Sequence, residues 1–379
     1  MKYVVEFREP SRAAAMAARI AAEVEPDRTY RIMEFCGGHT HAIARHGIAQ
    51  LLPANLRLIH GPGCPVCVLP IGRIDQAITL ALRHGAIVCS YGDAMRVPAS
   101  DDLSLLKARA RGADIRMVYS AADALDIARR HPDREVVFFA IGFETTTPPT
   151  ALVVQQADAE GVRNFSVLCC HVLTPSAISH IVDSGQAGEP DAVQIDGFVG
   201  PGHVSVVIGW QAYARFAQAH GKPVVVAGFE PLDVLQATLM LVRQLNEHRA
   251  EVENAFARAV TAQGNATARA AVEQVFEPRE RFEWRGLGEL AGSALRLRPR
   301  YADWDAERRF GLGYRAVPDH RQCLCGPILR GAKRPTDCKL FGTVCTPQHP
   351  MGSCMVSSEG ACAAHYAYGR CHQQDEAAS

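Results

Sequence analysis

Cysteine is the residue type that points most directly to chemistry in this chain, because thiolates bind metals and take part in redox reactions. The 379-residue sequence contains 13 cysteines. Seven of them lie beyond residue 320: Cys323, Cys325, Cys338, Cys345, Cys354, Cys362 and Cys371. Three more lie upstream in glycine- and proline-rich turns: Cys36, Cys64 and Cys67. This distribution predicts a C-terminal cage for a metal centre and a separate set of reactive or carrier thiols.

The downstream cysteines have a spacing that favours one type of metal centre. Cys325, Cys338, Cys345 and Cys362 are separated by 12, 6 and 16 residues. Four thiolates can hold a tetrahedral zinc ion or an iron–sulfur cluster. Zinc ribbons usually pair their ligands as C-x2-C, and this pairing is missing here. Single ligands on flexible loops favour the larger cluster, with Cys323 as a competing ligand beside Cys325.

Cys36 stands at the end of a predicted strand, in the motif CGGHTH. Binding crevices of open α/β sheets lie at the carboxyl ends of strands, so Cys36 is a candidate site residue. The two glycines allow a tight turn and the close approach of a ligand. His39 and His41 follow directly and are candidates by proximity. The alternative is a small buried residue in a tight turn.

Cys64 and Cys67 form a C-x-x-C pair in GPGCPVC. Such a pair can form a reversible disulfide, and a helix N-terminus can stabilise its thiolate. The helix-like stretch that begins near Ile71 would supply that terminus. Half of a zinc site is the alternative for a lone C-x-x-C, but the chain has no second one.

The bulk composition excludes several classes of function. Lys plus Arg equals Asp plus Glu, at 40 each, so there is no basic excess that would indicate a nucleic-acid surface. No run of 18 apolar residues predicts a membrane span, and the N-terminus lacks the pattern of a secretory signal. We therefore expect a cytoplasmic protein, in which cysteines serve metal or redox chemistry more often than structural disulfides.

Strand-like and helix-like segments alternate along most of the chain, which predicts parallel sheets built from βαβ units. The expected strands cover residues 30–35, 57–61, 86–92, 115–120, 135–142, 164–170, 197–200 and 222–230. Glycine-rich turns recur in the same order in the two halves, as at 61–63 and 200–202. This weak repeat favours two similar lobes, with chance recurrence of common turn residues as the alternative.

The expected division of the chain has four parts. They are an N-terminal helical segment over 1–27, packed with the C-terminal region, a first α/β lobe over 28–150, a second over 151–235 and a helical, cysteine-rich region over 236–379. Residues 233–310 have mostly helical spacing. From residue 311 on, Gly, Pro and Cys dominate, so this segment depends on a bound centre or on packing against the lobes.

Several motifs together closely resemble the HypD family of [NiFe]-hydrogenase maturation proteins, in order along nearly the whole chain. They are CGGHTH at 36–41, GPGCPVC at 61–67, YGDAMRVP at 91–98, GFETTTPPTA at 142–151, GPGHVS at 200–205, GFEPLD at 228–233 and the tail FGTVC…MVSSEGAC. The resemblance implies two related Rossmann-like lobes and a third region with a [4Fe-4S] cluster. It also implies that Cys325, Cys338, Cys345 and Cys362 are the cluster ligands, with Cys323 and Cys354 as extra thiols.

The resemblance further implies a role in building the Fe(CN)2CO unit of the hydrogenase active site. In this role the protein would serve the hydrogenase large subunit indirectly. Cys36 matches the family's iron-binding cysteine, and Cys64 and Cys67 match its redox pair. The implied partners are a small HypC-type chaperone, which shares the transiently bound iron, and a HypE-type donor of cyanide. Our own hypothesis is that His39 and His41 position the diatomic ligands or supply protons.

Three functions compete at this point. The leading one is an assembly scaffold with redox ability, which is not a conventional metabolic enzyme. The second is a free-standing dithiol/disulfide oxidoreductase that uses Cys64 and Cys67 with an electron-relaying cluster. The third is a binding module with a structural zinc. Cys36 separates the first two, because only the scaffold needs it to retain iron.

Overall fold

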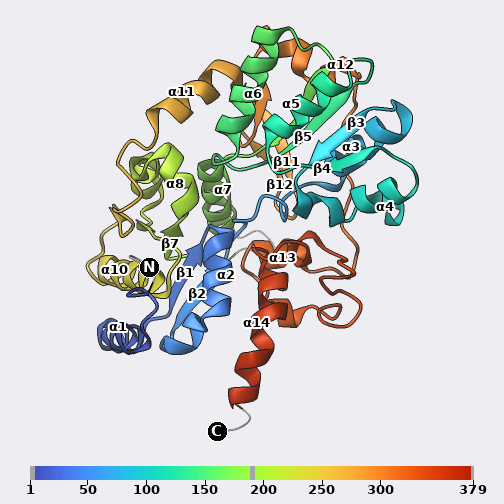
Figure 1. Cartoon of the computed structure of the whole chain (residues 1–379). Coiled ribbons are helices and arrows are strands. Elements are labelled where there is room, and N and C mark those ends of the chain that lie inside the picture. Colours follow the sequence, from blue (N-terminus) through green and yellow to red (C-terminus); the bar gives the residue numbers. More distant parts are fainter. Residues whose placement is uncertain (1–4, 188–192, 377–379) are drawn as a thin grey trace.

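The computed structural model describes residues 5–187 and 193–376, with side chains up to Gly369, so Cys371 lies outside the described side chains. Two parallel sheets with surrounding helices make up most of the described chain, and this confirms the predicted α/β class (Figure 1). We call them sheet A, with the order β2-β1-β7-β8-β9, and sheet B, with the order β4-β3-β5-β6. The cysteine-rich tail packs beside them.

Sheet A is entirely parallel. Its strands are β1 (Tyr30–Glu34), β2 (Leu56–His60), β7 (Gly197–Gly200), β8 (Val224–Val226) and β9 (Val252–Asn254). Helix α10 (Pro231–Asn246) packs against β7 and β8, and α1 (Pro10–Glu23) packs in turn on α10. Glu23 and Arg243 form an ion pair at 2.6 Å between these helices. Helix α1 lies within the expected N-terminal helical segment, and its partner is α10.

Sheet B is buried along three of its four strands, as expected where helices cover both faces of a parallel sheet, and only its edge strand β4 is partly exposed. The strands are β3 (Ile87–Ser90), β4 (Ile115–Met117), β5 (Val136–Gly142) and β6 (Phe165–His171). The helices before, between and after them are α3 (Ile71–Arg83), α4 (Leu105–Ala110), α5 (Ala121–Arg130), α6 (Thr147–Glu160) and α7 (Thr174–Ala187). All the strands expected from the alternating pattern are present at nearly the expected positions.

The two sheets are interleaved along the chain, which differs from one contiguous lobe over 28–150 and another over 151–235. The chain leaves sheet A after β2, builds all of sheet B and returns to sheet A at β7. The recurring turns at 61–63 and 200–202 therefore both lie at the edge of sheet A, after β2 and β7. Local sequence predicts strands, whereas their partners depend on which distant apolar faces bury one another.

The prediction of mostly helical structure over 233–310 is wrong beyond α10. This stretch contains β9, helices α11 (Ala266–Val275) and α12 (Ala306–Arg309), and two antiparallel pairs, β10 (Phe276–Pro278) with β13 (Leu295–Leu297) and β11 (Arg281–Trp284) with β12 (Gly288–Ala291). The pairs bury aromatic side chains such as Phe276 and Trp284. Tertiary burial of these aromatic residues overrides the local helical spacing.

The cysteine-rich tail has little regular structure between α13 (Cys325–Leu329) and α14 (Ala361–Glu376). Helix α14 packs against α2 (Gly37–Arg45), which follows β1 (Figure 1). The tail therefore reaches the edge of sheet A at which β1 ends. Of the described residues, none belongs to a helix long and apolar enough to cross a membrane, and the cytoplasmic location stays a prediction.

Candidate functional site

The motifs from the first and second halves of the chain meet at the carboxyl edge of sheet A. Strand β1 pairs in parallel with β2 on one side and with β7 on the other. The residues after these three strands, with Cys36, Cys64 and His203 among them, therefore lie at one edge. This is the position in which open α/β sheets usually bind ligands.

Cys36 is buried directly before α2, with its thiol facing His203. Its Sγ lies 3.8 Å from Nδ1 of His203. Burial, with smaller contributions from the carboxylates of Glu359 and Glu34, raises the pKa of Cys36 to about 12. The free thiol is thus protonated, and a metal that binds there must displace this proton.

Glu34 holds the turn that carries Cys36. Its fully buried carboxylate accepts a hydrogen bond from the backbone N–H of Cys36 at 3.0 Å. The hydroxyl of Thr40 also donates to it, and Nδ1 of His60 lies 2.9 Å away. A buried carboxylate with this many partners fixes the strand end rigidly. A charged residue at the end of an apolar strand was the sequence signal for it.

Glycines permit the close approach of three segments around Cys36. A Cβ atom at Gly63 would lie 2.4 Å from the backbone nitrogen of Cys36, and one at Gly37 would lie 2.5 Å from Cβ of Glu359. Distances this short do not occur between real atoms of these types. The glycines of CGGHTH and GPGCPVC therefore allow the turn that contains Cys64 and Cys67, and the tail, to pack against Cys36.

His39 and His41 lie beside Cys36 in sequence, but their rings make other contacts. His39 is buried, with Nε2 3.2 Å from the carbonyl oxygen of Ala227, and its ring stacks on Phe229. His41 has Nδ1 3.3 Å from the carbonyl oxygen of Ser358. The histidine in contact with the Cys36 thiol is His203. Any role of His39 and His41 with diatomic ligands stays a prediction.

Cys64 and Cys67 are joined by a disulfide, with their Cα atoms 5.2 Å apart. Both residues are buried. Helix α3 begins at Ile71, four positions after Cys67, where a helix was expected. The backbone of this turn touches the Cys36 turn, because the N–H of Gly37 donates to the carbonyl oxygen of Gly63 at 2.9 Å. The disulfide and the Cys36 thiol therefore belong to one site.

Six cysteines of the tail line one small pocket, which we call the cysteine pocket. They are Cys323, Cys325, Cys338, Cys345, Cys354 and Cys362. The four predicted ligands are thus brought together, and both of the extra thiols lie with them. Cys325 and Cys354 are joined by a disulfide, and the other four are free. Apolar side chains such as Ile328 complete the lining.

The donor set of the cysteine pocket fits a soft metal centre by its chemistry. Burial, together with negative charge at Cys323, Cys345 and Cys338, raises the pKa of Cys362 well above its usual value. A cation would offset this repulsion between sulfurs. Within 5–187 and 193–376, however, no group of three or more His, Cys, Asp or Glu has the geometry to hold a metal ion. The cluster itself therefore stays a prediction.

The cysteine pocket and the Cys64–Cys67 disulfide adjoin one another. The hydroxyl of Ser353 donates to the carbonyl oxygen of Cys67 at 2.5 Å. A Cβ atom at Gly360 would lie 3.0 Å from Sγ of Cys67 and 2.3 Å from the carbonyl oxygen of Cys354. The cysteine pocket and the Cys64–Cys67 disulfide are therefore separated by little more than the backbone of the tail.

The motif YGDAMRVP holds the tail in this position. The guanidinium of Arg96 donates to the carbonyl oxygens of Pro347 and Val356, at 2.8 and 3.0 Å. The hydroxyl of Ser357 donates to the carboxylate of Asp93 at 2.8 Å. The structure thus gives this motif a positioning role that its sequence did not reveal.

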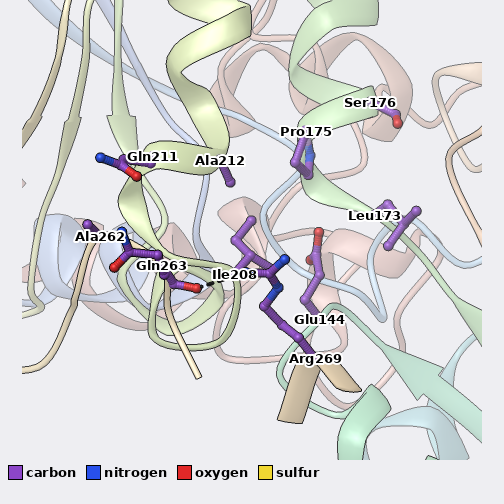
Figure 2. A pocket seen from close by; sticks show the side chains of 10 residues that line it. All are labelled: Glu144, Leu173, Pro175, Ser176, Ile208, Gln211, Ala212, Ala262, Gln263 and Arg269. Carbon is purple, nitrogen blue, oxygen red and sulfur yellow. Dashed lines mark hydrogen bonds between the residues drawn. The ribbon is translucent and has the colours of Figure 1, made fainter. Parts of the chain in front are cut away.

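A second hollow lies at the carboxyl ends of β5 and β6, in the motif GFETTTPPT (Figure 2). This pocket of about 430 Å³ is lined by residues that include Glu144 and Arg269. The carboxylate of Glu144 accepts from the N–H and hydroxyl of Thr174, at 2.8 and 2.9 Å, so it caps α7. Burial raises the pKa of Glu144 to about 7.

The threonine side chains of this motif do not cap α6, the helix that follows them. The hydroxyls of Thr146 and Thr147 both donate to the carbonyl oxygen of Phe143. An N-cap side chain must instead accept from a helix N–H. The motif therefore contributes a cap through Glu144, to α7 and not to its own helix.

Fold and site together define a class of α/β proteins in which a buried thiol, a disulfide and a cysteine-lined pocket adjoin at one sheet edge. The family model described as HypD, hydrogenase formation hypA family, matches residues 11–369. The hydrogenase maturation factor HypD of Cupriavidus necator is 68% identical over 370 residues, which cover 98% of each chain. The proteins of that name from Azotobacter vinelandii and Escherichia coli K12 are 65% and 46% identical over 373 residues, 97–98% of each chain. The chain belongs to the HypD family of hydrogenase maturation factors.

Proposed function

We propose that this protein is a redox-capable scaffold on which the Fe(CN)2CO unit of a [NiFe]-hydrogenase is assembled. In this proposal it acts in complex with a HypC-type chaperone, receives cyanide from a HypE-type donor and serves the large subunit of the hydrogenase indirectly. The observation that supports it most is the convergence of Cys36, the Cys64–Cys67 disulfide and the cysteine pocket. Family membership supports the maturation role, and this convergence supports the proposed thiol chemistry.

The iron is the cargo of this reaction, and Cys36 is its proposed ligand, with a cysteine of the chaperone as another. A thiolate is a soft donor and suits a low-spin iron that carries strong-field ligands. His203 faces the same sulfur, and burial lowers its pKa, so its ring is neutral. A neutral imidazole can accept a hydrogen bond from the Cys36 thiol and direct the proton that leaves when iron binds.

The Cys64–Cys67 pair is proposed to supply the electrons for the release of cyanide. A thiocyanate-like donor that accepts two electrons and two protons releases hydrogen cyanide and leaves a thiol. The dithiol form of Cys64 and Cys67 gives up two electrons and two protons and becomes the disulfide present in the structure. The exchange balances within the two partners. Because the Cys64–Cys67 pair lies next to Cys36, the released cyanide would be beside the proposed iron.

The four predicted cluster ligands, Cys325, Cys338, Cys345 and Cys362, would hold a [4Fe-4S] cluster in the cysteine pocket. When bound, such a cluster supplies electrons one at a time. The pocket adjoins Cys67, so the tail cysteines would hold this source of electrons beside the disulfide that has to be reduced. Cys323 and Cys354 line the same pocket and compete for places in the ligand set.

A free-standing dithiol/disulfide oxidoreductase is the second candidate function. The disulfide beside the cysteine pocket supports it as well as it supports the scaffold. The two differ over Cys36, because an oxidoreductase without iron cargo would keep its disulfide cycle when this thiol is lost. The scaffold would lose its iron.

Infrared spectroscopy of the anaerobic protein, co-purified with its chaperone, tests this difference. We expect bands in the cyanide and carbonyl stretching region for the unchanged protein and their loss in Cys36→Ala. Cys89→Ala is the matched control, because Cys89 is buried in the core of sheet B and should leave the bands intact. Intact bands in Cys36→Ala would refute Cys36 as the ligand, and bands absent from the unchanged complex would refute the scaffold.

A further inference from the structure

Ser353 lies at the contact between the cysteine pocket and the redox disulfide. Its side chain is fully buried in the tail, between Gly352 and Cys354. Its Oγ lies 2.5 Å from the carbonyl oxygen of Cys67 and 3.4 Å from Sγ of Cys325. One hydroxyl therefore touches a residue of the redox pair and a predicted cluster ligand.

A serine hydroxyl has one proton, so it can donate to only one of these two acceptors at a time. In the structure the acceptor is the Cys67 carbonyl, because a carbonyl oxygen cannot donate. Cys325 carries no thiol proton there, since its sulfur is bonded to Cys354. A sulfur with negative charge, as in a metal-bound thiolate, is a stronger acceptor and would compete for the same proton.

We propose that Ser353 is a positioning residue that couples the two thiol sites through this single proton. The inference rests on the proposed function, because it needs a cluster in the cysteine pocket. When negative charge on the Cys325 sulfur increases, the hydroxyl turns toward it and releases the carbonyl of Cys67. When that charge decreases, the hydroxyl returns to the carbonyl. The switch itself breaks no covalent bond once Cys325 is released from its disulfide with Cys354 and serves as a ligand, and the redox state of one site is transmitted to the backbone of the other.

The surroundings of Ser353 make this hydrogen bond effective. The hydroxyl is shielded from solvent, so water does not screen it or replace it as a donor. Hydrogen bonds to the sulfurs of an iron–sulfur cluster are among the factors that set its reduction potential. A donor to a ligand sulfur stabilises the reduced, more negative form. Loss of the Ser353 hydroxyl should therefore lower the potential.

The test is an anaerobic redox titration of the full chain, followed by electron paramagnetic resonance and by the visible absorbance of the cluster. For Ser353→Ala we expect a lower potential, equivalent to a change of about tenfold in the ratio of reduced to oxidised cluster, or about 59 mV for one electron. Iron content per chain should stay the same. Ser353→Thr restores a hydroxyl and should return the potential toward that of the unchanged protein.

Ser357→Ala is the matched control. This serine is also buried in the tail, but its hydroxyl donates to Asp93, away from both sulfurs. We expect no change in potential for this variant. Equal potentials in Ser353→Ala and the unchanged protein, or equal shifts in Ser353→Ala and Ser357→Ala, would overturn the inference and leave the proposed function intact. An unchanged protein without any cluster signal would refute the cluster and this inference together.

Discussion

The carboxyl edges of the two sheets have the same type of topology and very different chemistry. At sheet A, three strand ends present a thiol, a disulfide and an imidazole, and the cysteine-rich tail covers them. At sheet B, the corresponding edge presents Glu144, which caps a helix beside an open pocket. Parallel α/β topology therefore offers two equivalent crevices, and the segment that packs over one of them decides which becomes the thiol site.

The strongest way to break the sheet A site is to separate its segments. Gly63→Ala would place a Cβ atom 2.4 Å from the backbone nitrogen of Cys36, and neither backbone can move freely. We expect the free energy of unfolding to fall by about 3 kcal/mol, as in severe overpacking. Urea unfolding measures it. Gly313→Ala, where no atom lies within 4 Å of the added Cβ, should change little, and a stable Gly63→Ala would contradict the close approach.

Removal of the Glu34 carboxylate should have the next largest effect. Glu34→Ala leaves the N–H of Cys36 and the hydroxyl of Thr40 without their buried acceptor. Buried groups that lose a partner cost about 1–3 kcal/mol each, so we expect a loss of about 2–3 kcal/mol in urea unfolding. The comparison variant is Glu289→Ala, which removes an exposed ion pair with Arg281 and should cost less than about 1 kcal/mol. Similar losses in both variants would argue against a structural role for Glu34.

Sheet B should respond to pH through Glu144. Its pKa is about 7 in the folded protein, above the usual value of 4.5, so the folded state keeps a proton that the unfolded chain releases. The contribution to stability is full below about pH 4.5 and is lost as the pH rises through 7, by about 2–3 kcal/mol between pH 5 and pH 8. Urea unfolding at pH 5 and pH 8 measures it. Glu144→Gln cannot titrate and should show a smaller loss; an equal loss in both proteins would exclude Glu144 as the source.

The smallest loss of stability is expected when a buried thiol of sheet B is removed. Cys170 is buried on β6, and burial raises its pKa to about 12, so it is unreactive. Cys170→Ala should cost about 1 kcal/mol through lost packing, in line with small core truncations. The infrared bands of the proposed iron cargo should not change. Loss of those bands would show that the two sheet edges are less independent than their structures indicate.

Much of the fold was predictable, because strand and helix signals are local. Apolar runs such as 136–142 and the turn at Cys36 both lie where the pattern placed them. The main error in secondary structure has a tertiary cause. Residues 233–310 were predicted to be mostly helical, but within them the aromatic side chains of Phe276 and Trp284 are buried in two short β pairs. His203 and Ser353 were missed as neighbours of the thiols for a similar reason, since each approaches from a distant segment.

The α/β class, the positions of the strand ends and the thiols at those ends can all be derived from the amino-acid sequence. These features depend on neighbouring residues and on the periodicity of burial. Folding of the whole chain was needed to show that β7 pairs with β1, that Cys36 faces His203 and that the tail packs against the Cys64–Cys67 disulfide. The physical reason is that each of these contacts joins segments more than a hundred residues apart. Burial and hydrogen bonding of the whole chain select them, and no local pattern encodes them.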